Sequence, residues 1–193
     1  MPDLDRMMIF IDGENLVFRY QQMLKKGGNP HADVDHIPDV FFWHHNLPPS
    51  MGRYKIPRAT YYTYAVGDEK HLESLHEQIK AARFHQGEGG VPPYLTPKIF
   101  KKPKQQAQKK GVDIQLTVDV LTQVYNDNID AVYLMSGDGD YIPLIEEVKR
   151  RGKQVYVAAF SEGRSKSLIY AADHFANLDD EVFFNPPSNN PSA

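Results

Sequence analysis

The sequence predicts an α/β protein, a three-layer α/β/α sandwich around a mainly parallel central sheet. Short continuous apolar runs such as Met8–Ile11 and Ala131–Met135 have the length and composition of strands buried on both faces. Segments with apolar residues at helical spacing separate these runs, and such alternation of strand and helix is typical of a three-layer sandwich. A chain of 193 residues is long enough to bury one sizeable core, so a single domain is the simplest arrangement.

The first half of the chain contains two of the expected helices. Leu16–Leu24 has apolar residues at helical spacing, with Asn15 as a plausible N-cap and Gly27-Gly28 as a stop. Residues 29–57 carry scattered prolines, and we expect a short helix there and a loop at Pro48-Pro49. The elements expected next are a strand over Arg58–Val66, a helix over Lys70–Phe84, a glycine-rich break at 87–90 and a partly edge strand over Pro92–Phe100.

The second half repeats the strand–helix alternation after a lysine-rich loop, Lys101–Lys110. A helix over Asp113–Tyr125 is expected to carry one apolar stripe, formed by Ile114, Val118, Leu121 and Tyr125. Pro143 suits the first turn of the helix that follows Ala131–Met135, and Gly152 suits its exit. The remaining expected elements are a strand over Gln154–Phe160, a helix over Ser165–His174, a short strand near Glu181–Phe184 and a disordered tail over 185–193.

Two apolar runs end in acidic clusters. Met8–Ile11 leads into Asp12-Gly13-Glu14-Asn15, and Ala131–Met135 leads into Ser136-Gly137-Asp138-Gly139-Asp140. Ligands bind at the carboxyl ends of strands in open α/β sheets. Carboxylates gathered there repel one another unless a cation lies between them, and hard oxygen ligands favour Mg²⁺ or Mn²⁺. If the two strands are neighbours, Asp12 meets Asp138 and Asp140 in one acidic metal site.

Asp113 and Asp119 form a third acidic group, on the helix that feeds the second of these strands. Six residues of helix correspond to about 600° of rotation, so the two carboxylates do not point the same way. They are both direct ligands only if Asp113 precedes the regular helix; otherwise one acts through water or a lysine. Structural alternatives are a helix cap for Asp113, a cap for Asp140 on the helix entered through Pro143, and an ordinary exposed position for Asp119.

Several polar and basic residues suit phosphate chemistry. Asn15 and Ser136 can orient water or a phosphate oxygen through neutral hydrogen bonds. Tyr61, Tyr62 and Tyr64 either stack on single-stranded bases or belong to the core. We assign the histidines no ligand role, because His44-His45 would point two ways on any regular element. The basic residues expected to contact an RNA backbone, with a solvated loop as the alternative for the lysines, are Lys101, Lys102, Lys104, Lys109, Lys110, Arg58 and Arg164.

Composition excludes several classes of protein. The chain has no cysteine, and therefore no disulfide, thiolate nucleophile or cysteine-ligated metal. Its net charge of −3 gives no global attraction to nucleic acid, so polyanions must bind through local patches. The N-terminus lacks the pattern of a signal peptide, and no stretch has the length of a membrane span. We expect a soluble, cytoplasmic protein with no membrane partner.

The acidic motifs resemble those of the NYN domain of the PIN-like nuclease superfamily, specifically its LabA-like branch. The order and spacing of all three blocks agree, and the resemblance covers about Met7 to Leu178. Residues 30–57 are poorly covered and read as a family-specific insertion into one domain spanning 1–184. The matching blocks are Phe10-Ile11-Asp12-Gly13-Glu14-Asn15, Lys110-Gly111-Val112-Asp113 with Leu116 and Asp119, Ser136-Gly137-Asp138-Gly139-Asp140-Tyr141 with Pro143-Leu144, and the strand from Gly152 to Val157.

This resemblance implies a PIN-like fold and a Mg²⁺- or Mn²⁺-dependent ribonuclease acting on single-stranded RNA. Asp12 and Asp138 would be direct metal ligands, and Asp119 or Asp113 would supply a further carboxylate. Asp140 would hold metal-bound water, while Asn15 and Ser136 would support the site. Exposed apolar edges near Phe41-Phe42-Trp43 could also form a homodimer.

Other functions remain open at this point. An aspartyl-phosphate phosphohydrolase would need an Asp where Glu14 stands, and a Toprim-like enzyme expects a Glu in the place of Asp12. A dinucleotide-binding domain would need a Gly-x-Gly-x-x-Gly turn after the first strand, which is lacking. The non-enzymatic alternative is a catalytically weak module that binds RNA or a protein through the same cleft.

Overall fold

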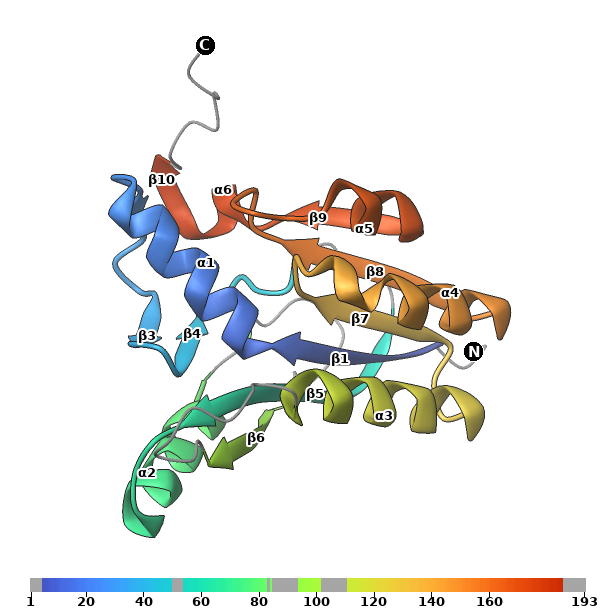
Figure 1. Ribbon diagram of the computed structural model, residues 1–193, viewed down its shortest axis with the longest axis horizontal. Helices are drawn as coiled ribbons and strands as arrows, with labels where there is room; N and C mark the ends of the chain where they lie inside the picture. Colours follow the sequence, from blue (N-terminus) through green and yellow to red (C-terminus); the bar gives the residue numbers. More distant parts are fainter. Residues whose placement is uncertain (1–4, 50–53, 83, 85–93, 102–110, 186–193) are drawn as a thin grey trace.

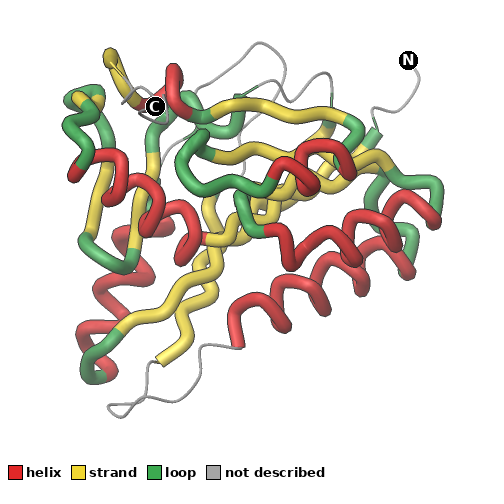
Figure 2. The backbone as a smooth tube through the Cα atoms, turned by 45° about the horizontal axis from the view of Figure 1, so that its top comes forward, coloured by secondary structure: helices red, strands yellow, loops and turns green. Residues whose placement is uncertain are grey.

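The central feature of the computed structural model is a six-stranded parallel sheet covered by helices on both faces (Figures 1 and 2). The structure describes residues 5–49, 54–82, 84, 94–101 and 111–185. The strand order is β6-β5-β1-β7-β8-β9, which places the N-terminal strand in the middle of the sheet. The predicted three-layer α/β sandwich is therefore confirmed.

The strands and helices follow one another as the alternating pattern predicts. The sheet strands are β1 (Arg6–Asp12), β5 (Lys55–Ala65), β6 (Leu95–Lys101), β7 (Ala131–Met135), β8 (Gln154–Ala159) and β9 (His174–Asn177). The helices are α1 (Gly13–Lys25), α2 (Glu69–Lys80), α3 (Gly111–Tyr125), the 3₁₀ turn η1 (Gly139–Tyr141), α4 (Ile142–Arg150), α5 (Lys166–Ala171) and α6 (Asp179–Val182). Two small antiparallel sheets pair β2 (Asn29–Pro30) with β10 (Phe183–Asn185), and β3 (Asp35–Ile37) with β4 (Phe41–Trp43).

Strand β1 shows how the sheet divides the core into two layers. Met7, Ile9 and Ile11 point to the face covered by α1 and β4. Met8 and Phe10 point to the opposite face, covered by α3 and α4. Side chains alternate between the two faces of a strand, so Asp12 follows Phe10 toward the α3/α4 layer. A strand that is apolar on both faces is what burial between two layers requires.

The short helix expected within residues 29–57 was wrong. The described part of this segment forms the small strands β2, β3 and β4, while the loop at Pro48-Pro49 is confirmed. Phe41, Phe42 and Trp43 are 3%, 0% and 0% exposed, because β4 packs between α1 and β5. These side chains therefore do not offer the exposed apolar edge that was expected to support a dimer.

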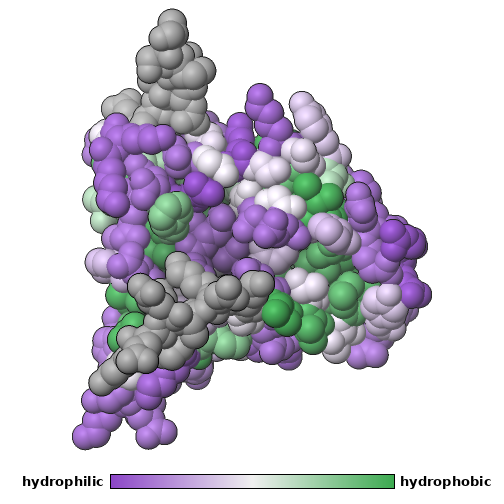
Figure 3. All heavy atoms as spheres, viewed as in Figure 1, coloured by the Kyte–Doolittle hydropathy of each residue, from purple (hydrophilic) through white to green (hydrophobic). Residues whose placement is uncertain are grey.

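Helix α3 buries a different apolar stripe from the one expected. Val112, Leu116, Val120 and Val124 face the sheet. Ile114, Val118 and Tyr125 are 60%, 49% and 53% exposed, and Leu121 is partly buried. Figure 3 shows hydrophobic residues on the surface where α3 lies in Figure 1. Both stripes have helical spacing, so periodicity alone does not decide which one is buried.

The C-terminal part departs from expectation in one respect. The expected helix over Ser165–His174 ends at Ala171, and His174 begins β9, an edge strand that the sequence did not reveal. The strand expected near Glu181–Phe184 is present as β10 after the short helix α6. The glycine-rich break at 87–90 and the tail after Asn185 lie outside the described residues. Within the described residues, no helix is long and apolar enough to cross a membrane.

Candidate active site at the carboxyl ends of β1 and β7

Strands β1 and β7 are hydrogen-bonded neighbours, so their carboxyl ends meet. Ile11 lies opposite Met135, which brings Asp12 beside Ser136. Both side chains are buried, at 3% and 0% exposure, and the Ser136 hydroxyl donates to Asp12 Oδ2 at 2.9 Å. The first two acidic blocks of the sequence therefore form one site.

A hydrogen-bond network fixes the two loops against each other. Asp12 caps α1 by accepting from the Asn15 amide at 3.1 Å, and Asn15 Oδ1 accepts from the Gly137 amide at 3.0 Å. The Asp138 amide donates to Ser136 Oγ at 3.1 Å, and Asp138 Oδ1 accepts from the Asp140 amide at 3.0 Å. Asp138 thus caps η1, whereas Asp140 is exposed and does not cap α4.

Gly13 permits the close approach of β1 to β5 at this point. A Cβ atom at Gly13 would lie 2.1 Å from Tyr61 Cε1 and 2.7 Å from the carbonyl oxygen of Tyr62. Real Cβ atoms do not come this close to other heavy atoms. Packing therefore explains why glycine follows Asp12, because any side chain at position 13 would push α1 away from the sheet.

Asp113 joins this cluster from α3. It lies in the first turn of the helix, which already begins at Gly111, and its Oδ1 accepts from the Tyr141 hydroxyl at 3.2 Å. Burial raises the pKa of Asp113, and the charges of Asp138, Glu14 and Asp140 raise it further. A capping role is not what the structure shows for Asp113. We call Asp12, Asp113, Asp138 and Asp140 the oxygen cluster.

Asp12 is the most perturbed carboxyl of the oxygen cluster. Burial raises its pKa from 3.8 to about 7, against the opposing effect of the hydrogen bonds from Asn15 and Ser136. The charges of Asp113 and Asp138 raise the pKa further. A cation is stabilised beside a buried carboxylate that has other acids around it, because the negative charges attract it.

Asp119 lies apart from the oxygen cluster. Its Oδ2 accepts from Lys98 Nζ at 2.5 Å and from the Tyr62 hydroxyl at 2.6 Å, while Gln115 donates to Oδ1 at 2.9 Å. Although desolvation acts in the opposite direction, the hydrogen bond from Lys98 and those from the two neighbours keep the pKa of Asp119 below its usual range. Its lone pairs are engaged by these three partners, and Lys98 supplies the kind of lysine contact expected for one of the two helix aspartates.

The predicted RNA-binding residues are spread over different places. Arg58 lies on β5 four positions before Tyr62, the residue opposite Asp12, and this is about 13 Å along the strand. Lys101 is exposed at the end of β6, near the start of α3 in the fold. Arg164 lies beside the oxygen cluster, because a Cβ at Gly137 would be 3.3 Å from its Cα. Lys102, Lys104, Lys109 and Lys110 lie outside the described residues.

The tyrosines of β5 serve the fold rather than base stacking. Tyr61 and Tyr62 are fully buried. The Tyr64 hydroxyl accepts from the Gly111 and Val112 amides at 2.7 and 3.2 Å, and so satisfies two free amides at the start of α3. This contact fixes the helix that presents Asp113.

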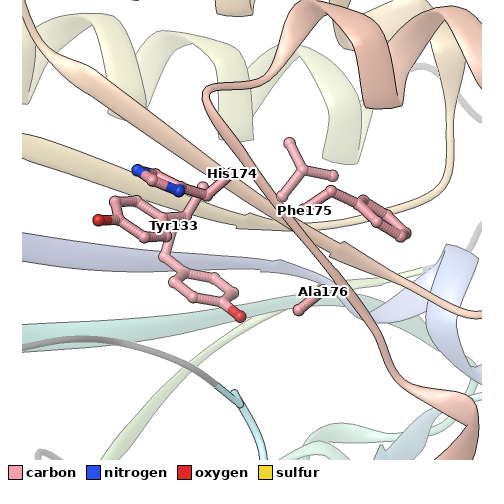
Figure 4. Close-up of a pocket in the computed structure, with 6 residues that line it drawn as sticks. Tyr133, His174, Phe175 and Ala176 are labelled. Atoms are coloured by element: carbon pink, nitrogen blue, oxygen red, sulfur yellow. The ribbon is translucent and has the colours of Figure 1, made fainter.

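Two cavities differ in their relation to the site. One, of about 150 Å³, lies along β7, β8 and β9 and is lined by Tyr133, Tyr156, Val157, His174, Phe175 and Ala176, with the Phe175 ring pointing away from Tyr133 and His174 (Figure 4). It contains no acidic side chain. The other, of about 420 Å³, lies at α5 and the loop before it, and the Ser165 amide of this loop donates to the Gly137 carbonyl at 3.0 Å. It is lined by Ser161, Arg164, Lys166, Ile169 and Tyr170.

A second set of metal-ligating side chains was missed in the sequence. Asp33, His44 and His45 are, within the described residues, the set of three whose donor atoms all lie within 4.8 Å of one another. The expectation that His44 and His45 point two ways applied to a regular element, but both residues follow the end of β4, lie in a turn and contact Asp33. The carboxylates of the oxygen cluster are spaced more widely than this.

Comparisons with known proteins agree with this fold. The crystal structure of a protein of unknown function, VPA0982 from Vibrio parahaemolyticus, superposes with a TM-score of 0.63 at 22% identity, covering 95% of this chain and 99% of that one. The uncharacterized protein MJ0482 of Methanocaldococcus jannaschii is 36% identical over 70 residues, which are 36% of this chain and 29% of that protein. The match thus spans under a third of this relative.

The family assignment comes from a match over most of the chain. The model of the NYN domain matches residues 6–179, from the start of β1 to the start of α6, and includes every member of the oxygen cluster. This family has a nuclease-like fold. The chain therefore belongs to the NYN domain family.

Proposed function

We propose that this protein is a metal-dependent ribonuclease of the LabA-like branch, which hydrolyses phosphodiester bonds of single-stranded RNA with water. One observation carries the proposal. The Asp12 carboxyl is buried at the end of a central parallel strand, faces Asp113 and Asp138, and has its pKa raised to about 7. Such a site favours a bound cation. The NYN family to which the chain belongs has a nuclease-like fold, which supports a nuclease in particular.

The donor set fits Mg²⁺ or Mn²⁺. Asp12, Asp113 and Asp138 offer only carboxylate oxygens, and their mutual repulsion is relieved by a divalent cation. We propose these three residues as direct ligands and give Asp119 a structural role, because Lys98 and Tyr62 already neutralise and bind it. A bound cation supplies a water of lowered pKa and stabilises negative charge on the reacting phosphate.

The residues of this chain position the reacting groups. Ser136 and the Asn15 amide hold the Asp12 carboxylate, and Asn15 Oδ1 holds the loop that carries Asp138. Asp140 is exposed beside these acids, where it can orient the attacking water and accept its proton. Water attacks the phosphorus and the 3′-oxygen leaves, so the P–O3′ bond breaks and the products carry 5′-phosphate and 3′-hydroxyl ends. The ribose 2′-hydroxyl takes no part, and no cyclic phosphate forms.

The cavity beside Gly137 suits a flanking nucleotide. Arg164 and Lys166 provide positive charge for a phosphate, and the Tyr170 ring is 83% exposed and free to stack on a base. We expect Tyr170→Ala to weaken RNA binding by roughly 1–3 kcal/mol, the usual contribution of one stacked base. Fluorescence anisotropy with labelled RNA measures this, and Tyr125→Ala, an exposed tyrosine on α3, is the matched control.

Cleavage of labelled single-stranded RNA in EDTA, Mg²⁺ or Mn²⁺ tests the proposal. The wild type and Asp180→Asn, an exposed acid far along the chain, should cut only with metal, and Asp138→Asn should not cut. The end groups should be 5′-phosphate and 3′-hydroxyl. Cleavage that proceeds in EDTA, or that leaves a 2′,3′-cyclic phosphate, would contradict the mechanism. RNA that binds without being cut would favour the binding module.

A further inference from the structure

The turns on either side of the β3–β4 hairpin bring three potential metal ligands together. Asp35 pairs with Trp43 in the hairpin, and continuing this register outward sets Asp33 opposite His45. Asp33 lies in the turn closed by the Val34 amide and the His31 carbonyl, and His44 begins the turn closed by the Leu47 amide. Because His44 and His45 lie in a turn, their side chains do not alternate between two faces as they would in a strand. Both rings therefore reach Asp33.

The two carboxylate oxygens of Asp33 each face a different imidazole. Oδ1 lies 3.1 Å from His44 Nε2, and Oδ2 lies 2.8 Å from His45 Nδ1. In a tetrahedral site with ligand bonds near 2.0–2.2 Å, neighbouring donors are about 3.3–3.6 Å apart. Both Asp33–histidine distances lie within about an ångström of this spacing, and all three donor atoms lie within 4.8 Å of one another.

Burial and charge favour the metal-binding forms of these groups. His44 is 2% exposed, and its burial lowers its pKa, so its ring is neutral at neutral pH. Although desolvation alone would raise the pKa of Asp33, hydrogen bonds and the neighbouring imidazoles lower it, and the carboxylate is ionised. His44 and Asp33 are therefore in the forms that bind a metal ion, and the partly exposed His45 and Asp33 leave one side open to water.

We propose that Asp33, His44 and His45 bind a divalent transition-metal ion, best matched by Zn²⁺, which joins the two turns of this hairpin. Imidazole nitrogen selects such ions over Mg²⁺, so this site differs in chemistry from the oxygen cluster. We name Asp33, His44 and His45 the histidine cluster. Its proposed role does not depend on the proposed nuclease activity.

Binding requires one rearrangement of a proton. His44 Nδ1 accepts from the Asn46 amide at 3.4 Å, so without metal the ring proton resides on Nε2 and is donated to Asp33. When Nε2 binds the ion, that proton moves to Nδ1 and the ring stays neutral. Two contacts are lost, the hydrogen bond from His44 Nε2 to Asp33 and the long contact with the Asn46 amide, and the bonds from both side chains to the ion replace them.

The ion would stabilise the β3–β4 hairpin, which packs against α1 and the central sheet. Strand β4 is tied to the central sheet by the Phe42 amide, which donates to the Tyr61 hydroxyl at 3.1 Å. Thr63 Oγ1 adds a bond to the Val40 carbonyl at 2.6 Å. A metal that joins residue 33 to residues 44 and 45 would stabilise this hairpin against opening, and therefore raise the melting temperature of the protein.

Titration of Zn²⁺ and Co²⁺ into chelator-treated protein tests the site. Because the oxygen cluster can also bind Zn²⁺, calorimetry is done on Asp138→Asn, which should bind one Zn²⁺ per chain, and Co²⁺ should produce the visible absorption of a site of low coordination number. Asp33→Asn and His45→Asn, both at exposed positions, should reduce affinity by more than the roughly 10- to 100-fold lost with an outer-shell partner. Melting curves should show a smaller stabilisation by Zn²⁺ in these two variants than in the wild type.

Two control variants make the result specific. His76→Asn removes an exposed histidine that also lies near an acid, at 3.7 Å from Glu77, and should bind Zn²⁺ like the wild type. Asp138→Asn disables the oxygen cluster and should also leave this binding intact. Equal Zn²⁺ affinity in His45→Asn and the wild type overturns the proposal, as does binding that needs Asp138 or no binding at all. Circular dichroism without metal verifies that each variant is folded.

Discussion

The oxygen cluster and the histidine cluster differ in both position and electrostatics. The oxygen cluster lies at the carboxyl ends of the two central strands, where burial raises the pKa of Asp12 to about 7 and the neighbouring acids add to this effect. The histidine cluster lies in two turns of a peripheral hairpin, and its one carboxylate is already paired with two imidazoles. The oxygen cluster is therefore destabilised when all its carboxyls are ionised and no cation is bound. The side chains of the histidine cluster already form hydrogen bonds with one another without a cation.

This contrast shows two ways in which a fold prepares a site for positive charge. In the sheet, backbone topology forces carboxylates together, and their repulsion remains until a cation or a proton neutralises them. In the hairpin, hydrogen bonds hold the donors in place beforehand, so an ion replaces protons instead of relieving repulsion. Metal binding should accordingly have a large effect on chemistry at the first site and a mainly structural effect at the second.

The largest expected difference between the clusters is in activity. Asp138→Asn should lower the rate of RNA cleavage at least about 10²–10³-fold, as loss of one electrostatic contact to the reacting phosphate typically does. His45→Asn should leave the rate in saturating Mg²⁺ unchanged. Initial rates with labelled RNA measure both, and a comparable loss in the two variants would mean that the clusters are not independent.

The pH dependence of stability should be next in size. In EDTA, the stability contributed by the Asp12 carboxyl is complete below pH 3.8 and is lost as pH rises to about 7, because its folded pKa lies above its ordinary value. A rise from 3.8 to about 7 corresponds to ~4 kcal/mol. The stability of Asp12→Asn relative to wild type should therefore increase by up to this amount between pH 4 and pH 7.

Urea unfolding at a series of pH values measures this difference. Mg²⁺ should reduce it, since a bound cation lowers the pKa of Asp12. A difference that stays flat over this range would show that the folded carboxyl titrates like an exposed one. Asp33→Asn is the companion variant from the histidine cluster, and it should not gain stability as the pH rises, because the pKa of Asp33 is lowered.

Gly13→Ala should have a somewhat smaller effect, a loss of folding stability at the start of α1, next to Asp12 of the oxygen cluster. The added Cβ meets the buried Tyr61 ring and the Tyr62 carbonyl, so a loss of ~3 kcal/mol, at the upper end for overpacking, is expected. Gly27→Ala is the control: its φ of +88° is strained for Ala, but nothing lies within 4 Å, and about 1 kcal/mol is expected. Denaturant midpoints separate the two, and equal losses would contradict the packing argument.

The smallest expected effect is the loss of folding stability in Asp119→Asn, which distinguishes the role of Asp119 from that of Asp113. Asp119→Asn should cost ~1–2 kcal/mol of stability through its weakened bonds to Lys98 and Tyr62, with cleavage within a few-fold of wild type. Asp113→Asn should instead lose activity while folding normally. The readouts are urea unfolding and initial rates on the same samples. A reversal of the two patterns would move the third metal ligand from Asp113 to Asp119.

Much of the central fold and the pairing of the two acidic blocks could be predicted from the sequence. Ala131–Met135 was located to the residue, because a strand buried on both faces is a continuous apolar run. The acids at its end and at the end of β1 meet because parallel neighbours end at the same edge. The topological rule that ligands bind there needs no long-range detail.

The missed features depend on tertiary contacts. Helix α3 carries two apolar stripes, and only its docking on the sheet selects the one with Val112 and Leu116. The expected helix in residues 29–57 was wrong because β4 is stabilised by burial against α1 and β5, which local propensity does not reveal. The histidine cluster depends on the register of one hairpin and on the turns beside it. Adjacent histidines carry no periodic signal that would have indicated it.

The central position of β1 has a consequence for how the chain folds as it is synthesised. Its neighbours are β5 and β7, so the apolar segment Met7–Ile11 gains its second partner only when residues 131–135 have been made. At about 5–20 residues per second, this leaves the strand without its full pairing for roughly 6–25 s. Nascent chains stalled before β7 should therefore bind chaperones that recognise apolar segments, and those stalled after β8 should have been released.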